Sequence, residues 1–545
     1  MLVLLTGAVA LRVPWRARVL DNWDSSNFSL AMERFDLASH QPHPPGYILY
    51  VAVGKLFNVF FHDPNNALVA LSITSFVVSV FLVYMVGGWM FGRSTGIVAA
   101  IILIFSPLAW FHSEVALSYL AELPWVILGT GLLYQLFFHR RYAILTGGVL
   151  AVGAGFRTDV FLFLGPLWFV GIWRTGWRTA LWSLLAAGAA LLSCLSPLIY
   201  LSGGFSSYFD ASQILYGAVT GPTNVSANGM QAFRQNLMDV WKAVLWFTGL
   251  AAPLIFFLPL ALLRTYRDTW TRLLFLLVLP LPALVEFLFV YFGHPGYAFI
   301  FGGTLLLLLA RSVVMMGECA GRAERYFASG NRGELATAAD SNMSMSGATL
   351  TGYVLMALFL LAVSAGNSYL FLKATKINHE APFTGYSVAT LYGGYSAGGL
   401  SAAETNTNLL IDEVRRFEPG DTMIVNAYPY DLKITDWRRT LYYLPEFRDA
   451  ILWMTSGAEY SVAWHHTVEK RMTTSVTVDG DVRQILFIGL DGSQVHQANQ
   501  SGSQSGLQTA VTSEALPAID DVPLTLVRFP AGGSTITVGP YTIGR

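Results

Sequence analysis

Long apolar runs recur through most of the chain and limit what it can fold into. Between residues 66 and 372 they have lengths of about 15 to 25 residues, close to the ~20 that an α-helix needs to cross a bilayer. Hydrophobic residues make up 54% of the 545 residues and charged residues only 12%, about half the charged share of a soluble domain. The sequence therefore predicts an α-helical polytopic membrane protein.

The runs predict about eleven transmembrane helices. Their expected ranges are 1–14, 66–91, 94–111, 115–137, 142–156, 158–173, 179–202, 240–263, 272–292, 297–317 and 348–371. The opening MLVLLTGAVAL has no charged n-region and no cleavage site after it, so we expect it to belong to the first helix and not to a signal peptide. Segment 45–61 is short and begins at a Pro-Pro-Gly break, which favours a re-entrant or interfacial helix.

The polar sequence GFRTD interrupts the apolar run at 142–173. One continuous crossing would hold Arg157 and Asp159 at the bilayer centre, at a cost of several kcal/mol. Two short helices separated by an outer turn are therefore expected.

Basic residues predict the orientation of these helices. Twelve arginines lie in alternate loops, whereas the opposite loops after the first hold only Arg157, Arg234 and Lys242. The twelve are Arg93, Arg140, Arg141, Arg174, Arg178, Arg264, Arg267, Arg272, Arg311, Arg322, Arg325 and Arg332. The positive-inside rule places this set in the cytoplasm together with the N-terminus. The first loop has three arginines of its own, but one loop does not outweigh five.

Several function classes are disfavoured by composition. A net charge of −1 gives no sign of nucleic-acid binding. Cys194 and Cys319 lie in or beside apolar segments, which argues against a disulfide framework or a metal knuckle. The lack of a disulfide framework, together with few lysines, indicates a bacterial inner membrane.

The composition changes at about residue 373, so we expect two domains, a transmembrane domain at 1–372 and an extracytoplasmic α/β domain at 373–545. Helical periodicity at 407–417, a strand at 420–427 and a strand pair across the Asp-Gly turn of 475–490 support this α/β domain. His465 and His466 are adjacent there, and without a partner cluster surface histidines are favoured over metal ligands.

Polar motifs gather in the loops that this topology places outside. The first loop contains DNWDSSNF at 21–28 and HQPHPPGYILY at 40–50, and later loops contain WFHSEVALSY at 110–119 and GFRTD at 155–159. These motifs resemble the GT-C superfamily of integral membrane glycosyltransferases, and within it polytopic proteins related to protein O-mannosyltransferases. Ile48 stands where the family usually has Pro, and Ser113 where it has Ala. The likeness covers residues 20–300, and no motif matches the tail.

The resemblance implies transfer of a sugar from a polyprenyl-phosphate donor, on the outer face, with inversion at the anomeric carbon. Asp24 occupies the family's Trp-Asp position and is the expected base; Asp21, three residues earlier, is the alternative. A positioned carboxylate contributes about 10²–10⁴-fold. An N-cap of the following helix is the structural alternative for Asp24.

The donor phosphate needs a cation, and Arg157 is the expected ligand, with pairing to Asp159 or to lipid headgroups as the alternative. His43, His294 and Tyr297 are further candidates for contact with the donor. Glu114 and Asp159 are candidates for orienting the acceptor or a metal, although a helix-start carboxylate is an ordinary structural feature. A divalent cation held by Asp24 and Glu114 remains open.

Two other function classes remain. A lipid or polysaccharide-precursor flippase would also contain intramembrane charges and broken helices. Glu122 is one such intramembrane carboxylate. A non-catalytic protein whose tail binds a surface partner is the third class, but it would not require acids and histidines to be concentrated in the first loop.

Overall fold

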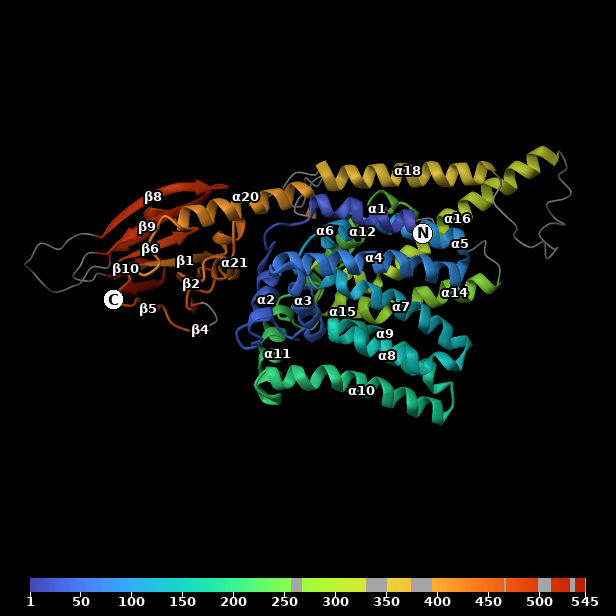
Figure 1. Ribbon diagram of the computed structural model, residues 1–545, viewed down its shortest axis with the longest axis horizontal. Helices are drawn as coiled ribbons and strands as arrows, with labels where there is room; N and C mark the ends of the chain where they lie inside the picture. Colours follow the sequence, from blue (N-terminus) through green and yellow to red (C-terminus); the bar gives the residue numbers. More distant parts are fainter. Residues whose placement is uncertain are drawn as a thin grey trace, which may run out of the picture. The chain divides into compact units, whose positions relative to one another are not determined.

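The apolar runs form helices of one compact unit in the computed structural model (Figure 1). The structure describes residues 1–255, 267–329, 350–373, 395–464, 467–497, 511–529 and 535–544. The helical unit comprises Met1–Arg16 and Pro44–Gly399, and the sheet unit comprises Ala17–His43 and Leu400–Arg545. His465 and His466 lie outside the described residues, as do parts of the predicted spans 240–263 and 348–371.

Helices are the main elements of the helical unit. Their bounds are α1 (Leu2–Arg12), α3 (Ile48–Phe61), α4 (Pro64–Phe91), α5 (Arg93–Ile104), α6 (Pro107–His112), α7 (Tyr119–Phe138), α8 (Ala143–Phe156), α9 (Asp159–Trp173), α10 (Trp177–Leu201), α11 (Phe205–Thr220), α12 (Val225–Thr248), α14 (Arg267–Val278), α15 (Leu281–Phe289), α16 (Phe299–Ser329) and α18 (Leu350–Lys373).

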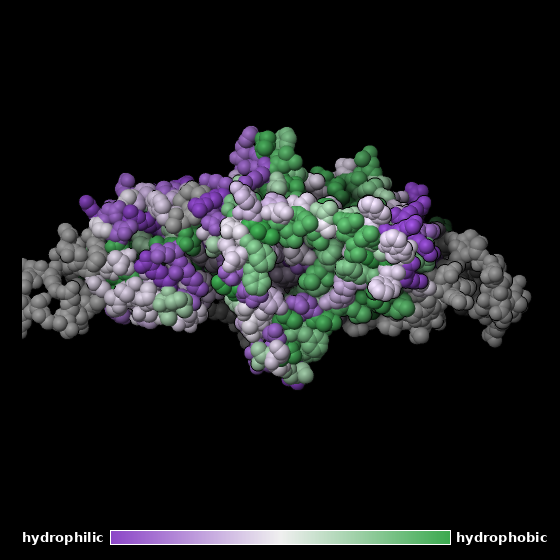
Figure 2. All heavy atoms as spheres, turned by 90° about the horizontal axis from the view of Figure 1, so that it is seen from below, coloured by the Kyte–Doolittle hydropathy of each residue, from purple (hydrophilic) through white to green (hydrophobic). Residues whose placement is uncertain are grey.

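Six helical stretches among the described residues are long and apolar enough to cross a membrane. They are Pro64–Phe91, Tyr119–Phe138, Trp177–Leu201, Thr271–Phe289, Pro295–Gly321 and Leu350–Lys373. Figure 2 shows hydrophobic residues over much of the surface of the helical unit in that view. On α10, for example, Trp182 and Leu192 are exposed, a surface that is stable only against an apolar solvent such as lipid. The predicted α-helical membrane fold is confirmed, and the count of eleven spans stays a prediction.

Several predicted spans differ from the structure. The range 94–111 is divided between α5 and α6, and the range 272–292 between α14 and α15. The range 240–263 was expected to be one helix, but α12 starts at Val225 and ends at Thr248. Gly249 follows with φ of 54°, a conformation that favours glycine and ends the helix. The apolar run therefore continues past the end of the helix.

The sheet unit contains a seven-stranded sheet in the order β4-β3-β2-β1-β6-β9-β8 and a four-stranded sheet in the order β5-β11-β10-β7. The strands are β1 (Thr422–Tyr428), β2 (Arg448–Trp453), β3 (Tyr460–Trp464), β4 (Thr467–Arg471), β5 (Ser475–Thr477), β6 (Gln484–Ile488), β7 (Val495–Gln497), β8 (Thr512–Ile519), β9 (Val522–Arg528), β10 (Thr535–Val538) and β11 (Tyr541–Gly544). Strand β1 pairs in parallel with β2 and β6, and the other pairs of the larger sheet are antiparallel.

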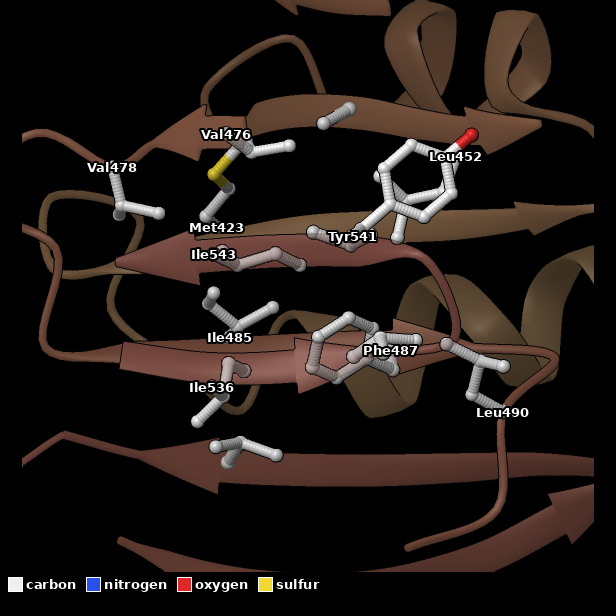
Figure 3. Packing of buried hydrophobic residues seen from close by; sticks show 14 of the residues in the cluster. Met423, Leu452, Val476, Val478, Ile485, Phe487, Leu490, Ile536, Tyr541 and Ile543 are labelled. Atoms are coloured by element: carbon white, nitrogen blue, oxygen red, sulfur yellow. The ribbon is translucent and has the colours of Figure 1, made fainter. Parts of the chain in front are cut away.

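Alternation along the central strands builds two cores. Ile485 and Phe487 of β6 face the four-stranded sheet (Figure 3), whereas Leu486 and Ile488 pack with α20 (Ala397–Val414) on the other face. This is the period of two that a strand imposes. Because both faces are covered, β6 is apolar at nearly every position.

The strand pair expected at 475–490 is wrong. Both strands exist, but β5 pairs with β11 and β6 pairs with β1 and β9. The Asp-Gly sequence between them connects two different sheets, so it does not close a hairpin.

A segment of the first loop belongs to the sheet unit. Helix α2 (Trp23–Glu33) packs against α21 (Trp437–Tyr443) and the sheet, in a core of Leu30, Trp437, Leu441, Ile451 and Ala463. The compact units therefore cross the predicted boundary at residue 372, and the division into a catalytic and an extracytoplasmic domain stays a prediction.

Candidate functional site

Helix α2 positions Asp24 in its first turn. The N-cap is Asn22, whose side-chain oxygen accepts hydrogen bonds from the backbone N–H groups of Asp24 (3.0 Å) and Ser25 (3.2 Å). The alternative role of Asp24 as the N-cap is therefore wrong. The Asp24 side chain is 32% exposed. The Asp24 carboxylate is therefore partly exposed to solvent, and it does not cap the helix.

His43 lies beside Asp24. Its Nδ1 atom is 3.2 Å from Oδ1 of Asp24, and its ring lies 5.4 Å from the ring of Phe28. The structure therefore brings two predicted site residues together from both ends of the first loop. A carboxylate and an imidazole at this distance are the components of a general-base pair.

Asp21 and His40 complete the polar groups of this segment. Asp21 precedes α2 and its N-cap, so Asp21 and Asp24 do not share a helix face. The pKa of Asp21 is raised to about 6, mainly by burial; the charge of Arg439 lowers this pKa and that of Asp436 raises it. Burial lowers the pKa of His40 to about 4, with contributions from Arg438 and His43. His40 is consequently neutral at pH 7.

Arg157 is the centre of a second polar group, in the helical unit. Its Nε lies 2.8 Å from Oε2 of Glu122, and a terminal nitrogen donates to Oδ2 of Asp159 at 2.7 Å. The other terminal nitrogen donates to Oγ of Ser118 at 3.1 Å. Arg157 is 3% exposed and Glu122 is fully buried. The pairing with Asp159 that the sequence offered as an alternative is therefore present.

Three tyrosines surround this arginine. The guanidinium carbon lies 4.5 Å from the ring centroid of Tyr119, 5.2 Å from that of Tyr297 and 5.4 Å from that of Tyr47. We call the group formed by Ser118, Glu122, Arg157, Asp159 and the three tyrosines the arginine cluster. Its members come from α7, the α8–α9 turn and the segments before α3 and α16, so tertiary folding alone assembles it.

His294 extends the arginine cluster through Tyr119. The two rings are stacked, with centroids 4.4 Å apart and planes at 8°. Nδ1 of His294 accepts a hydrogen bond from the backbone N–H of Gly296 at 3.0 Å. A Cβ on Gly296 would lie 2.4 Å from the Tyr119 ring, so glycine is required for this close approach. His294 and Tyr297 are thus brought together with Arg157, and their contact with a donor stays a prediction.

Glu114 is placed differently from the other predicted residues. It is fully buried, and its Oε1 accepts a hydrogen bond from Nε1 of Trp110 at 2.8 Å. Arg12 is buried nearby, with its guanidinium 4.5 Å from the Trp110 ring and its Nε donating to Ser113. This environment is that of a packed ionic group inside a helix bundle. A role of Glu114 in orienting an acceptor or a metal stays a prediction.

Sequence reasoning missed several residues that the structure joins to the site. Tyr47 lies inside the motif at 40–50 and Tyr119 ends the motif at 110–119, so the motifs were the signal available for both. Glu122 was noted only as an intramembrane carboxylate. Ser118 and His40 lie in the same two motifs but were given no role. In the described part of the chain, no group of three His, Cys, Asp or Glu side chains is arranged to hold a metal ion.

Comparison with known proteins gives a likeness of fold. No protein-family model and no curated protein matches the sequence. The crystal structure of ArnT from Cupriavidus metallidurans bound to undecaprenyl phosphate is similar, with 11% identity over 82% of this chain and 85% of that chain and a TM-score of 0.50. An apo structure of the Archaeoglobus fulgidus oligosaccharyltransferase has 13% identity over 81% of this chain and 62% of that chain, with a TM-score of 0.45. The likeness to ArnT shows that this chain has a GT-C-type fold.

Proposed function

We propose that the chain is an inverting glycosyltransferase, which moves a monosaccharide from a polyprenyl-phosphate donor to an acceptor hydroxyl. The Asp24–His43 pair carries this proposal, because a partly exposed carboxylate beside a histidine suits a general base. The fold shared with an ArnT bound to undecaprenyl phosphate supports a lipid phosphate as the leaving group.

In the proposed reaction Asp24 takes the proton of the acceptor hydroxyl as the hydroxyl oxygen attacks the anomeric carbon. The bond from that carbon to the phosphate oxygen breaks, and the lipid phosphate leaves with the bonding electrons. In-line attack from the opposite face inverts the anomeric centre. His43 fixes the orientation of the Asp24 carboxylate. It lies beside the proton that Asp24 receives from the acceptor.

The arginine cluster suits the departing phosphate, because a guanidinium in a buried site stabilises growing negative charge. Arg157 already has two carboxylate partners, so an incoming phosphate must replace one of them. Glu122 is fully buried, whereas 21% of the Asp159 side chain is exposed. Asp159 is therefore the carboxylate that the phosphate displaces, and the tyrosines and His294 border the same place.

We set this reaction on the extracytoplasmic face of a bacterial inner membrane, with the N-terminus in the cytoplasm. The distribution of arginines between alternate loops supports that orientation. The acceptor is a lipid, glycan or protein hydroxyl, and the sugar is a hexose or pentose.

The test is sugar transfer by membranes that contain the wild type, Asp24→Asn or Asp21→Asn, supplied with a panel of polyprenyl-phosphate sugars that includes mannose. Asp412→Asn removes an exposed carboxylate of α20 and is the matched control. Loss of transfer in Asp24→Asn, by about 10²-fold or more with donor binding retained, supports the proposed base.

Other outcomes are equally informative. Loss only in Asp21→Asn would move the base to Asp21, two residues before α2, and keep the reaction class. Absence of transfer by the wild type from every donor would overturn the proposal. Movement of labelled lipid across reconstituted vesicles would then be measured, because a flippase is one of the two other classes.

A further inference from the structure

The first loop contains a strained turn between Asp36 and Gln41. The two residues exchange backbone hydrogen bonds of 2.6 and 2.8 Å, and the Asp36 carboxylate accepts from the N–H and the hydroxyl of Ser39 at 3.3 and 3.0 Å. His40 within the turn has φ of 57°, a left-handed conformation that is unfavourable for residues other than glycine. Such a conformation persists only where the surrounding structure holds it.

Arg438 of α21 holds this turn from the side of the C-terminal segment. Its guanidinium donates a hydrogen bond to the backbone carbonyl of Ser39. The side chain is buried, with 2% exposed, and its guanidinium carbon lies 4.2 Å from the ring of Trp437. A buried arginine is costly unless it is paired. Here the carboxylates of Asp436 and Asp36 supply compensating charge.

The rest of α2 is attached to the same helix. The rings of Trp23 and Trp437 meet edge to face at 5.5 Å, and the backbone N–H of Leu20 donates to the Tyr443 hydroxyl at 2.7 Å. With Leu30 in the shared core, helix α21 contacts the segment before α2, both halves of α2, and the turn after it.

We propose that Arg438 is a positioning residue, which through Ser39 fixes the turn that sets His43 beside Asp24. This inference rests on the proposed function, because it assigns Arg438 a part in the same proton transfer. Asp24 lies on α2, and His43 lies after the turn at 36–41. Their separation of 3.2 Å therefore depends on the turn, which brings the chain back toward the start of α2. Both α2 and the turn after it contact α21.

Arg438 has a second effect on the same group. Its positive charge, after burial, is the largest influence that lowers the pKa of His40, and the charged or titratable groups that face His40 are Arg438, His43, Asp24 and Lys470. Removal of Arg438 therefore raises the pKa of His40 toward its ordinary value. The positive charge of a protonated His40 then makes the Asp24 carboxylate a weaker base, at a pH where the wild type is still active.

The experiment compares Arg438→Met and Arg438→Lys with the wild type, as full chains in detergent micelles. Arg528→Met removes an exposed arginine that pairs with Glu514, and is the matched control. We expect Arg438→Met to lower kcat about 10- to 100-fold with little change in the donor KM. We also expect the acid limb of kcat/KM to move to higher pH, and Arg438→Lys to restore part of both. Arg528→Met should match the wild type.

Hydrogen exchange gives a readout that does not depend on activity. Faster exchange in the segment 36–43 of Arg438→Met, and not of Arg528→Met, is expected if the arginine holds the turn. If Arg438→Met does not fold, Asp36→Asn releases the turn from its own side and should give the same exchange and the same fall in kcat.

Two results would overturn the inference. One is normal kcat and an unmoved acid limb in Arg438→Met while the wild type transfers sugar. The other is unchanged exchange at 36–43, whatever the activity. If the wild type transfers no sugar, the proposed function fails separately, and the exchange result still decides whether Arg438 holds the turn.

Discussion

The Nδ1 atom of His43 lies 3.2 Å from Oδ1 of Asp24, so the histidine of the HPPG motif contacts the proposed base. The sequence predicted that His43 binds the donor phosphate. The two roles have different kinetic consequences, because an orienting partner of the base acts in the transition state, whereas a phosphate ligand also contributes to donor binding.

We therefore expect His43→Ala to lower kcat about 10- to 100-fold, with the donor KM nearly unchanged. His43→Gln, which retains a hydrogen-bonding group, should recover part of the loss. His139→Ala replaces an exposed histidine after α7 and serves as the control. Steady-state kinetics with a polyprenyl-phosphate sugar measure both constants. A raised donor KM with normal kcat would instead support the phosphate-binding role of His43.

The second prediction concerns the charge balance around Arg157. If the donor phosphate displaces Asp159 from this arginine, Asp159→Asn removes the competitor. We expect the donor KM to fall by up to about tenfold, which corresponds to 1.4 kcal/mol. Arg157→Met should raise the donor KM, because the buried Glu122 and the partly exposed Asp159 then face the phosphate without a cation between them.

Asp210→Asn, on the exposed surface of α11, is the matched control for Asp159→Asn and should leave the donor KM unchanged. The measurement is the donor concentration dependence of transfer at fixed acceptor. A donor KM that rises in Asp159→Asn would contradict displacement, and would mean that the carboxylate itself contributes to donor binding.

Helix positions were largely predictable from the sequence where local signals set them. The run 66–91 became α4, Pro64–Phe91, because Asp63 caps the helix and Pro64 occupies its first turn. The break between α8 and α9 at Arg157 was also predictable, since a charged residue inside a continuous span is costly.

Features that depend on distant partners were not predictable. The end of α12 at Gly249 is fixed by Asn367 of α18, and the two strands of 475–490 pair with strands far along the chain. The candidate site shows the same division. Motifs identified Asp24, His43 and Arg157 one by one, but the contacts of His43 with Asp24 and of Arg157 with Glu122 arise only on folding.

The third prediction concerns Gly249. Its φ of 54° and ψ of −131° are unfavourable for any residue with a Cβ, and an added Cβ would lie 2.2 Å from Oδ1 of Asn367. That oxygen accepts the Leu250 N–H at 2.8 Å. We expect Gly249→Ala to destabilise the helical unit by about 2–4 kcal/mol, from backbone strain and from loss of this bond.

Gly188→Ala is the matched control, because it makes the same substitution inside α10 where a Cβ would meet nothing within 4 Å. It should be neutral or slightly stabilising, since alanine favours a helix by ~1 kcal/mol over glycine. Thermal unfolding in detergent distinguishes the two variants. Equal melting temperatures for both would show that α18 does not fix the end of α12.

The last prediction concerns the stability of the sheet unit as a function of pH. Asp431, after β1, is fully buried. Burial first, and then the carboxylate of Asp436, raise its pKa from 3.8 to about 8, while Arg439 and backbone N–H groups lower it. The folded state therefore binds the proton more tightly than the unfolded state. The contribution of this proton to stability is complete below about pH 4 and is lost as the pH rises to about 8.

We expect the free energy of unfolding of the sheet unit to fall between pH 5 and pH 9, and Asp431→Asn to remove a part of that fall on the order of a few kcal/mol. Burial also raises the pKa of Asp449, so some slope remains in the variant. Asp481→Asn is the control, because Arg448 lowers the pKa of that exposed carboxyl and it stays ionised over this range. Denaturant-dependent hydrogen exchange of β1 and β6 in the full chain measures the free energy at both pH values. An equal fall in the wild type and in Asp431→Asn would show that Asp431 ionises in the folded state as readily as it does in water.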